Sequence, residues 1–209
     1  MDSPARLFLI RHAEVEERYQ RVFGGRIDME LSPFGHEQAR TLADYLKRIP
    51  FDAIYASPMK RVQQTVEKLR DTHSPHPVFL EDLREVDFGV WTGLTWEEVK
   101  TQFSVSAFEW LDHLDRGLIS GAEAKADFRE RIERALQEVL KNSAGRSVAV
   151  VCHGGVIRMM LSILLDIPLV KMAGFDVEYA SVTWIDRFPH KTEVQLLNFA
   201  PWRDHAEAG

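Results

Sequence analysis

The sequence predicts an α/β protein, a three-layer α/β/α domain with a mostly parallel central sheet. Short apolar runs typical of buried strands alternate along the chain with longer stretches in which apolar residues recur every three or four positions, as in amphipathic helices. Strands that alternate with helices in this way favour a largely parallel sheet covered on both faces. The 209 residues suit one domain with a substantial core, and no repeat or linker divides them. We therefore expect a single domain over residues 1–209, with a helical insertion at about 91–121.

The first strand and the first helix have clear local signals. Residues 7–10 form a continuous apolar run, which is typical of a buried central strand. Further along the chain, Ser32 and Pro33 provide an N-cap and a first-turn proline. The apolar face of the helix that follows is predicted to contain Ala39, Leu42, Ala43 and Leu46.

The remaining elements follow the same alternation. Ser57-Pro58 repeats the helix-start signal, and the spacing of Thr95 and Glu98 is that of a capping box, which predicts a helix within the insertion. A long amphipathic helix is expected from Phe128 to Val139. The other strands are predicted at 52–56, 78–80, 147–151, 181–185 and 194–197.

Charge and composition exclude several classes of function. The formal net charge is −6, whereas binding a nucleic-acid backbone requires a basic surface. No stretch reaches the roughly 20 apolar residues of a membrane helix, and the first residues do not have the pattern of a signal peptide. The single cysteine, Cys152, cannot form an intramolecular disulfide. We expect a cytoplasmic protein that binds neither nucleic acid nor membrane, and a homodimer is left open.

Two histidines directly follow strong apolar strands. His12 comes after the first strand, and His153 follows the strand at 147–151, with Gly154-Gly155 at the start of a helix. Ligands of open α/β sheets bind outside the carboxyl ends of the strands, and a helix start offers free N–H groups to an anion. Arg11 adds a guanidinium at the same strand end. Together these features favour a phosphate site, although either histidine alone is more often part of a hydrogen-bonded core.

Five segments resemble, in order, motifs of the histidine phosphatases and cofactor-dependent phosphoglycerate mutases. They are LIRHAE, GGRIDMELSPFGHEQA, ASPMKRVQQT, LREVDFGVWTG and VVCHGGVIR. A single short match would carry little weight, but each of these falls on the expected strand end or helix start. The chain is most similar to the small phosphatase group that includes α-ribazole phosphatase. The resemblance implies a phosphoglycerate mutase-like fold.

The resemblance also implies a role for each matched residue. His12 would attack phosphorus as a neutral imidazole, while Arg11, Arg61 and His153 would surround the phosphoryl oxygens. Glu85 would protonate the leaving oxygen and then activate water. The helix start at Gly154 would add a backbone donor, and no metal or other cofactor would be needed.

The chain departs from the family pattern at several positions. Ala13 replaces a glycine after the nucleophile, and Arg18 stands where many members have a phosphate-contacting asparagine. The change at Arg18 either removes this phosphate contact or suggests a more strongly anionic substrate. In SGAEAKADF, Ala124 replaces a serine, which leaves the part played by Glu123 open. Substrate contacts are also expected from Arg26 and Phe23. Further candidates for the pocket wall are Trp91, Phe108 and Trp110.

Three alternative interpretations of individual residues are also considered. Asp87 is the alternative general acid to Glu85. Cys152 next to His153 suggests a thiol nucleophile, but a buried inert cysteine is favoured because no other part of the chain resembles a cysteine enzyme. His73 and His76 have a metal-binding spacing, yet Ser-Pro lies between them and a surface loop is preferred.

The function expected from these observations is hydrolysis of a small phosphorylated metabolite, a phosphomonoester, through a covalent phosphohistidine. The first alternative is a cofactor-dependent phosphoglycerate mutase, which shares the same catalytic core. The second is a non-catalytic member of the fold that only binds phosphorylated ligands.

Overall fold

The computed structural model describes residues 3–70 and 75–204. It contains one six-stranded sheet in the order β3-β2-β4-β1-β5-β6. The strands are β1 (Ala5–Arg11), β2 (Ala53–Ala56), β3 (Val78–Phe79), β4 (Ser147–Cys152), β5 (Val182–Arg187) and β6 (Thr192–Phe199). The first four run parallel, and β5 pairs antiparallel with both β1 and β6. This mixed, mostly parallel sheet confirms the predicted fold class.

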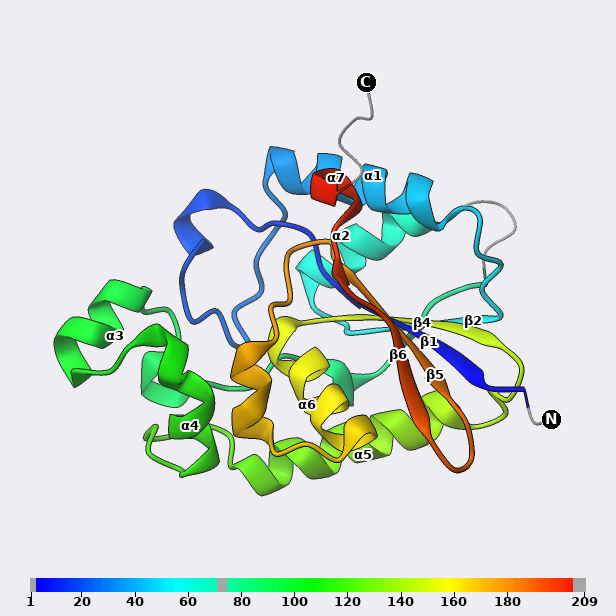
Figure 1. Cartoon of the computed structure of the whole chain (residues 1–209). Helices are drawn as coiled ribbons and strands as arrows, with labels where there is room; N and C mark the ends of the chain where they lie inside the picture. The colour runs from blue at the N-terminus through cyan, green and yellow to red at the C-terminus, as the bar shows by residue number, and fades with distance from the viewer. Residues whose placement is uncertain (1–2, 71–74, 205–209) are drawn as a thin grey trace.

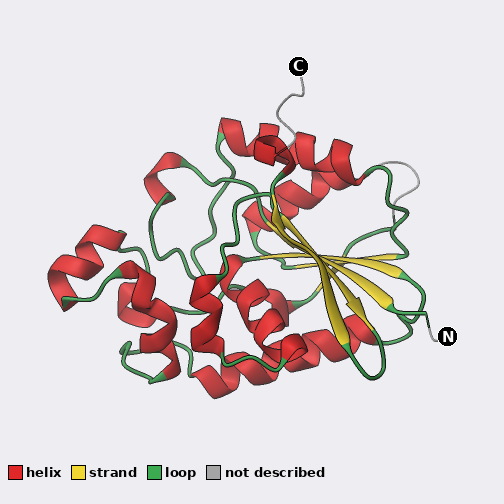
Figure 2. Ribbon diagram, in the orientation of Figure 1, coloured by secondary structure: helices red, strands yellow, loops and turns green. Residues whose placement is uncertain are grey.

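Helices cover both faces of the sheet, as Figures 1 and 2 show. On one face lie α1 (Pro33–Leu46), α2 (Lys60–Leu69) and the short α7 (Pro201–Asp204). The other face is covered by α5 (Lys125–Leu140) and α6 (Gly154–Leu165). Between β3 and α5 the chain forms α3 (Trp96–Phe103) and α4 (Trp110–Asp115), which lie to one side of the sheet. Short 3-10 segments are η1 (Glu17–Tyr19), η2 (Glu81–Leu83), η3 (Gly89–Trp91), η4 (Ala107–Glu109) and η5 (Leu169–Gly174).

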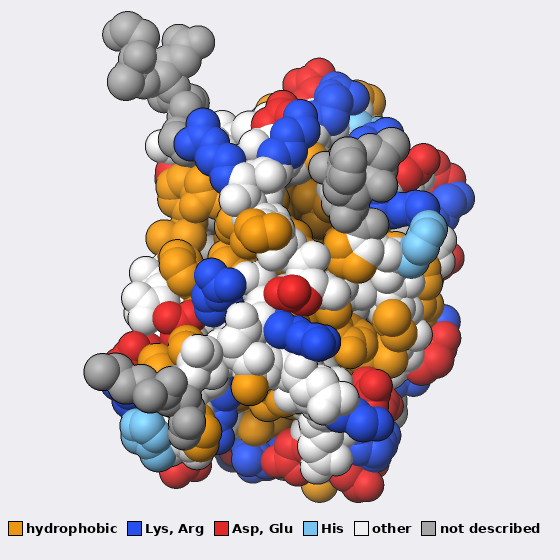
Figure 3. All heavy atoms as spheres, turned by 90° about the vertical axis from the view of Figure 1, so that its right-hand side faces the viewer, with side chains coloured by type: hydrophobic (Ala, Val, Ile, Leu, Met, Phe, Trp, Pro, Cys, Tyr) orange, Lys and Arg blue, Asp and Glu red, His pale blue; other side chains and the backbone are white. Residues whose placement is uncertain are grey.

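The core is divided between the two faces by the alternation of side chains along the strands. Leu7 and Leu9 of β1 pack with the apolar residues of α5 and α6, whereas Phe8 and Ile10 pack with those of α1 and α2. Both faces of the sheet are buried at β1 and β4, which explains why these strands contain uninterrupted apolar runs. On the face in Figure 3, apolar side chains lie between charged ones of both signs, so that face is not uniformly basic.

Most helix-start signals act as predicted. The Ser32 hydroxyl accepts a hydrogen bond from the Gly35 N–H at 2.8 Å, and Thr95 and Glu98 form the expected capping box. The signal at Ser57-Pro58 was wrong, because α2 begins only at Lys60 with Met59 as its N-cap. The Ser57 hydroxyl accepts from the Met59 N–H at 3.4 Å and lies 2.8 Å from Nε2 of His153, which follows the neighbouring strand β4. Local sequence does not encode this second contact.

Candidate active site

His12 follows β1 directly and is almost completely buried, with 5% of its surface exposed. Nδ1 lies 2.8 Å from the carbonyl oxygen of Ala13. Because a carbonyl oxygen only accepts, Nδ1 carries the proton and Nε2 carries the lone pair. Burial, reinforced by the charges of Arg61 and Arg11, holds the pKa of His12 well below its ordinary value. His12 is therefore a neutral imidazole, the form in which a histidine can act as a nucleophile.

Arg61 connects His12 to the loop that precedes α1. Its Nε donates to Nε2 of His12 at 3.2 Å, and its two terminal nitrogens donate to the carbonyl oxygens of Ile27 and Gly25 at 2.8 and 3.0 Å. Burial lowers the pKa of Arg61 to about 10, so the guanidinium is still charged at neutral pH. A planar cation thus sits next to the nucleophilic nitrogen, where it can bind phosphoryl oxygens.

Arg11 and Tyr179 form the neighbouring part of the site. A terminal nitrogen of Arg11 donates to the carbonyl oxygen of Val177 at 2.6 Å, and its guanidinium lies over the Tyr179 ring at 3.9 Å from the centroid. The Tyr179 ring also contacts that of His12, with centroids 5.5 Å apart. The segment before β5 therefore fixes the direction in which Arg11 points.

His153 ends β4 and occupies the N-cap position of α6. Its ring centroid lies 5.2 Å from that of His12, and its Nδ1 has no hydrogen-bond partner among the described residues. Burial is the main cause that lowers the pKa of His153 well below its usual value. The pairing of β1 with β4, in which Arg11 is opposite Cys152, accounts for the proximity of the two histidines.

The Glu85 carboxylate lines the site and is held by two backbone donors. It accepts from the Val86 N–H at 3.0 Å and from the Gly155 N–H in the first turn of α6 at 3.1 Å. Asp87, the alternative acid, instead accepts from the Gly89 N–H at 2.9 Å and is not among the residues that line the pocket. The geometry therefore favours Glu85 as the group that faces a ligand.

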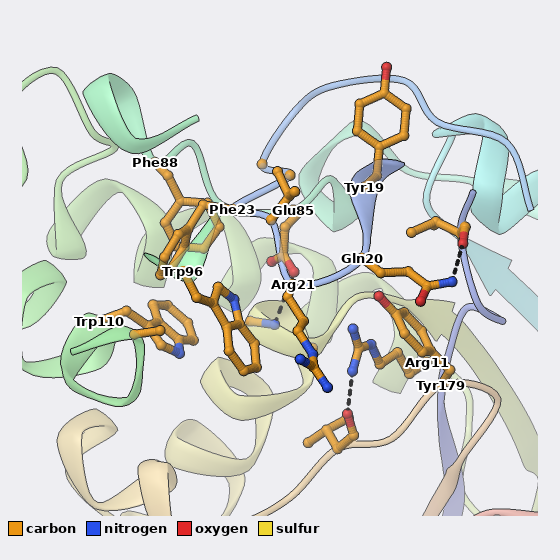
Figure 4. Close-up of a pocket in the computed structure, with 18 of the residues that line it drawn as sticks. Arg11, Tyr19, Gln20, Arg21, Phe23, Glu85, Phe88, Trp96, Trp110 and Tyr179 are labelled. Carbon is orange, nitrogen blue, oxygen red and sulfur yellow. Dashed lines mark hydrogen bonds between the residues drawn. The ribbon is translucent and has the colours of Figure 1, made fainter. Parts of the chain in front are cut away.

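These groups, apart from His153, line a cavity of about 440 Å³ with two unlike sides. His153 was expected to contact the substrate, but it is completely buried and does not line this cavity. One side is aromatic, and the other is cationic, with the acid Glu85 between them in the view of Figure 4. The aromatic side consists of Phe23, Phe88, Trp96, Phe108 and Trp110. Arg11 and Arg21 lie on the cationic side in this view, and Arg61 and Arg158 are the other arginines that line the cavity. Within residues 3–70 and 75–204, no cluster of His, Cys, Asp or Glu side chains is arranged to hold a metal ion.

The model of the histidine phosphatase superfamily (branch 1) matches residues 7–200. The chain belongs to this superfamily. It is 31% identical over 193 residues to phosphoserine phosphatase 1 of Hydrogenobacter thermophilus, covering 92% of each chain. It is 26% identical to the adenosylcobalamin/alpha-ribazole phosphatase of Salmonella typhimurium, covering 95% of this chain and 98% of the relative. These relatives support a phosphatase.

Solved structures of histidine phosphatases have the same fold. The alpha-ribazole phosphatase of Shigella flexneri superimposes with a TM-score of 0.80 at 23% identity, over 93% of this chain and 96% of that one. Phosphoserine phosphatase of Entamoeba histolytica, solved with 3-phosphoglyceric acid, gives a TM-score of 0.78 at 26% identity, over 93% and 96%. None of the helices in the described part of this histidine phosphatase is long and apolar enough to cross a membrane.

The structure does not bring every expected residue to the pocket of this histidine phosphatase. Arg18 is exposed and donates to both carboxylate oxygens of Glu16 at 3.2 Å. Arg26 points toward Glu123, with 3.5 Å between the charged atoms. Neither arginine lines the pocket, whereas Phe23 and Gly154 do. Among the other wall candidates, Phe108 and Trp110 line it and Trp91 does not.

Several pocket residues were missed by sequence reasoning. Arg21, Arg158 and Tyr179 all line the cavity. Arg158 was the residue with a usable signal, because it lies four residues after Gly154, one helical turn along the same face. No pattern marks Arg21 or Tyr179, since both lie in irregular segments whose direction depends on tertiary contacts.

Glu123 supports the site from outside the pocket. It forms a buried ion pair with Arg131 of α5, with Nε to Oε1 at 2.5 Å and Nη2 to Oε2 at 2.8 Å. Arg131 also donates to the carbonyl oxygens of Asp82 and Arg84 at 2.6 and 2.7 Å. The pair therefore anchors the segment that carries Glu85. Glu123 thus helps to position Glu85 and does not itself line the pocket.

Cys152 lies in the apolar core between the sheet and α5 and α6, in the same cluster as Val148 and Val150. Burial raises the pKa of its thiol, so the thiolate that a nucleophile requires is disfavoured. His73 lies outside the described residues, so the His73–His76 pair is not described.

Proposed function

We propose that this protein is a metal-independent phosphomonoesterase that hydrolyses a small phosphorylated metabolite through a phosphohistidine at His12. The observation that carries the proposal is the hydrogen bond from Nδ1 of His12 to the Ala13 carbonyl oxygen at 2.8 Å. It leaves the lone pair on Nε2, next to the Arg61 guanidinium. In the structure this lone pair accepts a long hydrogen bond of 3.2 Å from Nε of Arg61. Attack on phosphorus therefore requires that Arg61 exchange this bond for one to a phosphoryl oxygen, which leaves the nucleophile beside a phosphate-binding cation.

In the first half-reaction, Nε2 of His12 forms a bond to phosphorus as the bond to the ester oxygen breaks. Arg11, Arg61 and His153 stabilise the charge on the phosphoryl oxygens in the transition state. Protonated Glu85 gives its proton to the leaving oxygen, so the alcohol departs neutral. The product is an N-phosphorylated His12 and an ionised Glu85.

In the second half-reaction, the Glu85 carboxylate takes a proton from a water molecule that attacks the same phosphorus. The P–N bond to His12 breaks, inorganic phosphate is released, and both side chains return to their starting states. One acid-base group serves both steps because the water enters where the alcohol left.

Brief reaction with a ³²P-labelled phosphomonoester, followed by an alkaline quench, tests the proposal. We expect acid-labile phosphate on His12 and unchanged turnover in the presence of a strong chelator. His12→Ala should trap no label, whereas His190→Ala, at the exposed turn between β5 and β6, should label normally. Turnover of the His12→Ala protein at the wild-type rate would exclude His12 as the nucleophile.

A further inference from the structure

Arg158 is a half-buried cation in the pocket to which the proposed reaction gives no role. It lies in the second turn of α6, and one terminal nitrogen makes a long hydrogen bond of 3.3 Å to the Gly154 carbonyl oxygen. Its Nε has no hydrogen-bond partner among the described residues. An unsatisfied donor on a charged group is unfavourable, which makes Arg158 available to bind a ligand group in the pocket.

A second arginine lies next to Arg158. A Cβ atom placed on Gly154 would lie 3.3 Å from Nη1 of Arg158 and 3.7 Å from Nε of Arg11, so the two guanidinium groups flank this glycine. Nε of Arg11 also lacks a partner in the described part of the chain. Burial and then the charge of Arg11 lower the pKa of Arg158 to about 10, which leaves both groups charged at neutral pH. Glu85 and Asp176 act on Arg158 through their charge, but neither is within ion-pair distance of it among the described residues. Two neighbouring, partly buried cations of this kind favour an anionic ligand group beside them.

Arg158 lies at a different position relative to the reacting groups from Arg11 and Arg61. The pKa of His12 responds to the charges of Arg61 and Arg11, which places these arginines around the nucleophile. Arg158 instead lies against Gly154 at the start of α6 and donates to its carbonyl oxygen. Glu85 is bonded to Gly155, the next residue along α6 from the glycine that Arg158 contacts. Arg158 therefore lies on the side of the acid, where the alcohol portion of a substrate must be.

We propose that Arg158 binds a second anionic group carried by the alcohol portion of the substrate, for which a carboxylate is the simplest chemistry. The pocket would then select phosphomonoesters with an anionic group at both ends. This inference rests on the proposed function, because His12 and Glu85 define where the phosphate and the alcohol lie. Arg21, whose side chain points toward Arg11 in Figure 4, adds positive charge on the same side.

Two pairs of substrates that differ mainly in a carboxylate test the proposal. O-phosphoserine is compared with O-phosphoethanolamine, and 3-phosphoglycerate with glycerol 3-phosphate. A hydrogen bond to a charged group contributes about 1.5–3 kcal/mol, so kcat/KM of the wild-type protein should be roughly 10–100-fold higher for the carboxylate member of at least one pair. No preference in either pair would overturn the proposal without the use of any variant.

Arg158→Gln then assigns the preference to this side chain. We expect the carboxylate substrate to lose most of its advantage, with a much smaller loss for its partner. Equal losses on both members would show that Arg158 contacts the phosphoryl group, or acts on structure alone, and would overturn the proposal. Arg116→Gln, at the exposed end of α4, is the control and should leave the ratio unchanged.

A binding measurement separates this inference from the proposed function. Calorimetric titration of the His12→Ala protein with the same ligands reports affinity without turnover, and the His12→Ala/Arg158→Gln double variant tests the side chain. If a carboxylate preference in binding disappears in the double variant while the wild-type protein hydrolyses none of the esters, the proposed function fails and the inference stands. If the wild-type protein hydrolyses the esters but shows no carboxylate preference in rate or binding, the proposed function stands and the inference fails.

Discussion

At the scale of single residues, the side chains on regular elements were easier to predict than those on loops. His12, Arg61 and His153 follow a strand or begin a helix, and the structure brings all three together. Arg18 and Arg21 are only three residues apart, yet only Arg21 lines the pocket. The backbone of Arg21 is left-handed, with φ of 56°, and turns the chain after a 3-10 segment. Such a turn in a non-glycine residue depends on tertiary contacts that sequence does not reveal.

Glu85 provides the prediction at this scale. Glu85→Gln removes the transferable proton, so kcat/KM should fall by roughly 10²–10⁴-fold for glycerol 2-phosphate, whose leaving group needs protonation. The loss should be much smaller for 4-nitrophenyl phosphate, which leaves as a stable anion. Asp87→Asn is the matched control, because this carboxylate bonds to Gly89 outside the pocket and should not produce a difference between the two esters. Equal losses of Glu85→Gln on both esters would move the acid role to another residue.

At the scale of secondary-structure elements, helix starts were predicted where the cap acts within its own helix. Ser32 caps α1 and also donates to the Glu14 carboxylate at 2.7 Å, while the Glu14 N–H donates to Gln38 of α1 at 2.9 Å. The segment directly after His12 is thereby fixed to the first turns of α1. Ser57 has the same local signal, but its hydroxyl is used by His153 from a strand distant in sequence. The same hydroxyl accepts a long hydrogen bond of 3.4 Å from the Met59 N–H, so it closes a turn before α2 and does not act as the N-cap of the helix.

Gly35 gives the prediction for α1. Gly→Ala in a helix interior normally stabilises by roughly 0.5–1 kcal/mol. A Cβ at Gly35, however, would lie 2.0 Å from the Glu14 carbonyl oxygen, a backbone atom that cannot move independently. We expect Gly35→Ala to lower the free energy of unfolding by about 1–3 kcal/mol in urea denaturation, and to reduce activity because Glu14 is close to His12 in sequence. Thr41→Ala, exposed on the same helix, should change the free energy of unfolding by less than about 0.5 kcal/mol. A stabilised Gly35→Ala protein would contradict the close packing of this helix start.

At the scale of the whole molecule, the strand order explains why distant motifs form one site. The parallel neighbours β2, β4 and β1 end at the same edge of the sheet, which brings together the residues that follow them. This part of the site was predictable, because ligands of open α/β sheets bind at the carboxyl edge. The aromatic rim of the pocket, which includes Trp96 and Phe108, was not predictable. Its position depends on how the segment with α3 and α4 packs. That packing leaves Phe108 78% exposed and Trp96 40% exposed at the pocket.

The last prediction is whether the protein hydrolyses phosphomonoesters or acts as a phosphoglycerate mutase. The exposure of the aromatic rim to solvent bears on this choice. Both reactions share a phosphohistidine, but a mutase must exclude water while a bisphosphorylated cofactor stays bound. A pocket bordered by exposed aromatic rings admits water to the intermediate. Asp176 and Glu178 also line it and would repel the extra charge of a bisphosphorylated ligand.

Arg158 and Arg21 favour a second anionic group, which a phosphoglycerate also has, but positive charge does not by itself exclude water. We therefore expect inorganic phosphate to be released from monoesters, and negligible interconversion of 2- and 3-phosphoglycerate when 2,3-bisphosphoglycerate is supplied. Phosphate release and an enolase-coupled assay, run on the same preparation, compare the two rates directly. Interconversion much faster than phosphate release would mean that the rim closes over the intermediate in solution, and would assign the protein to the mutases.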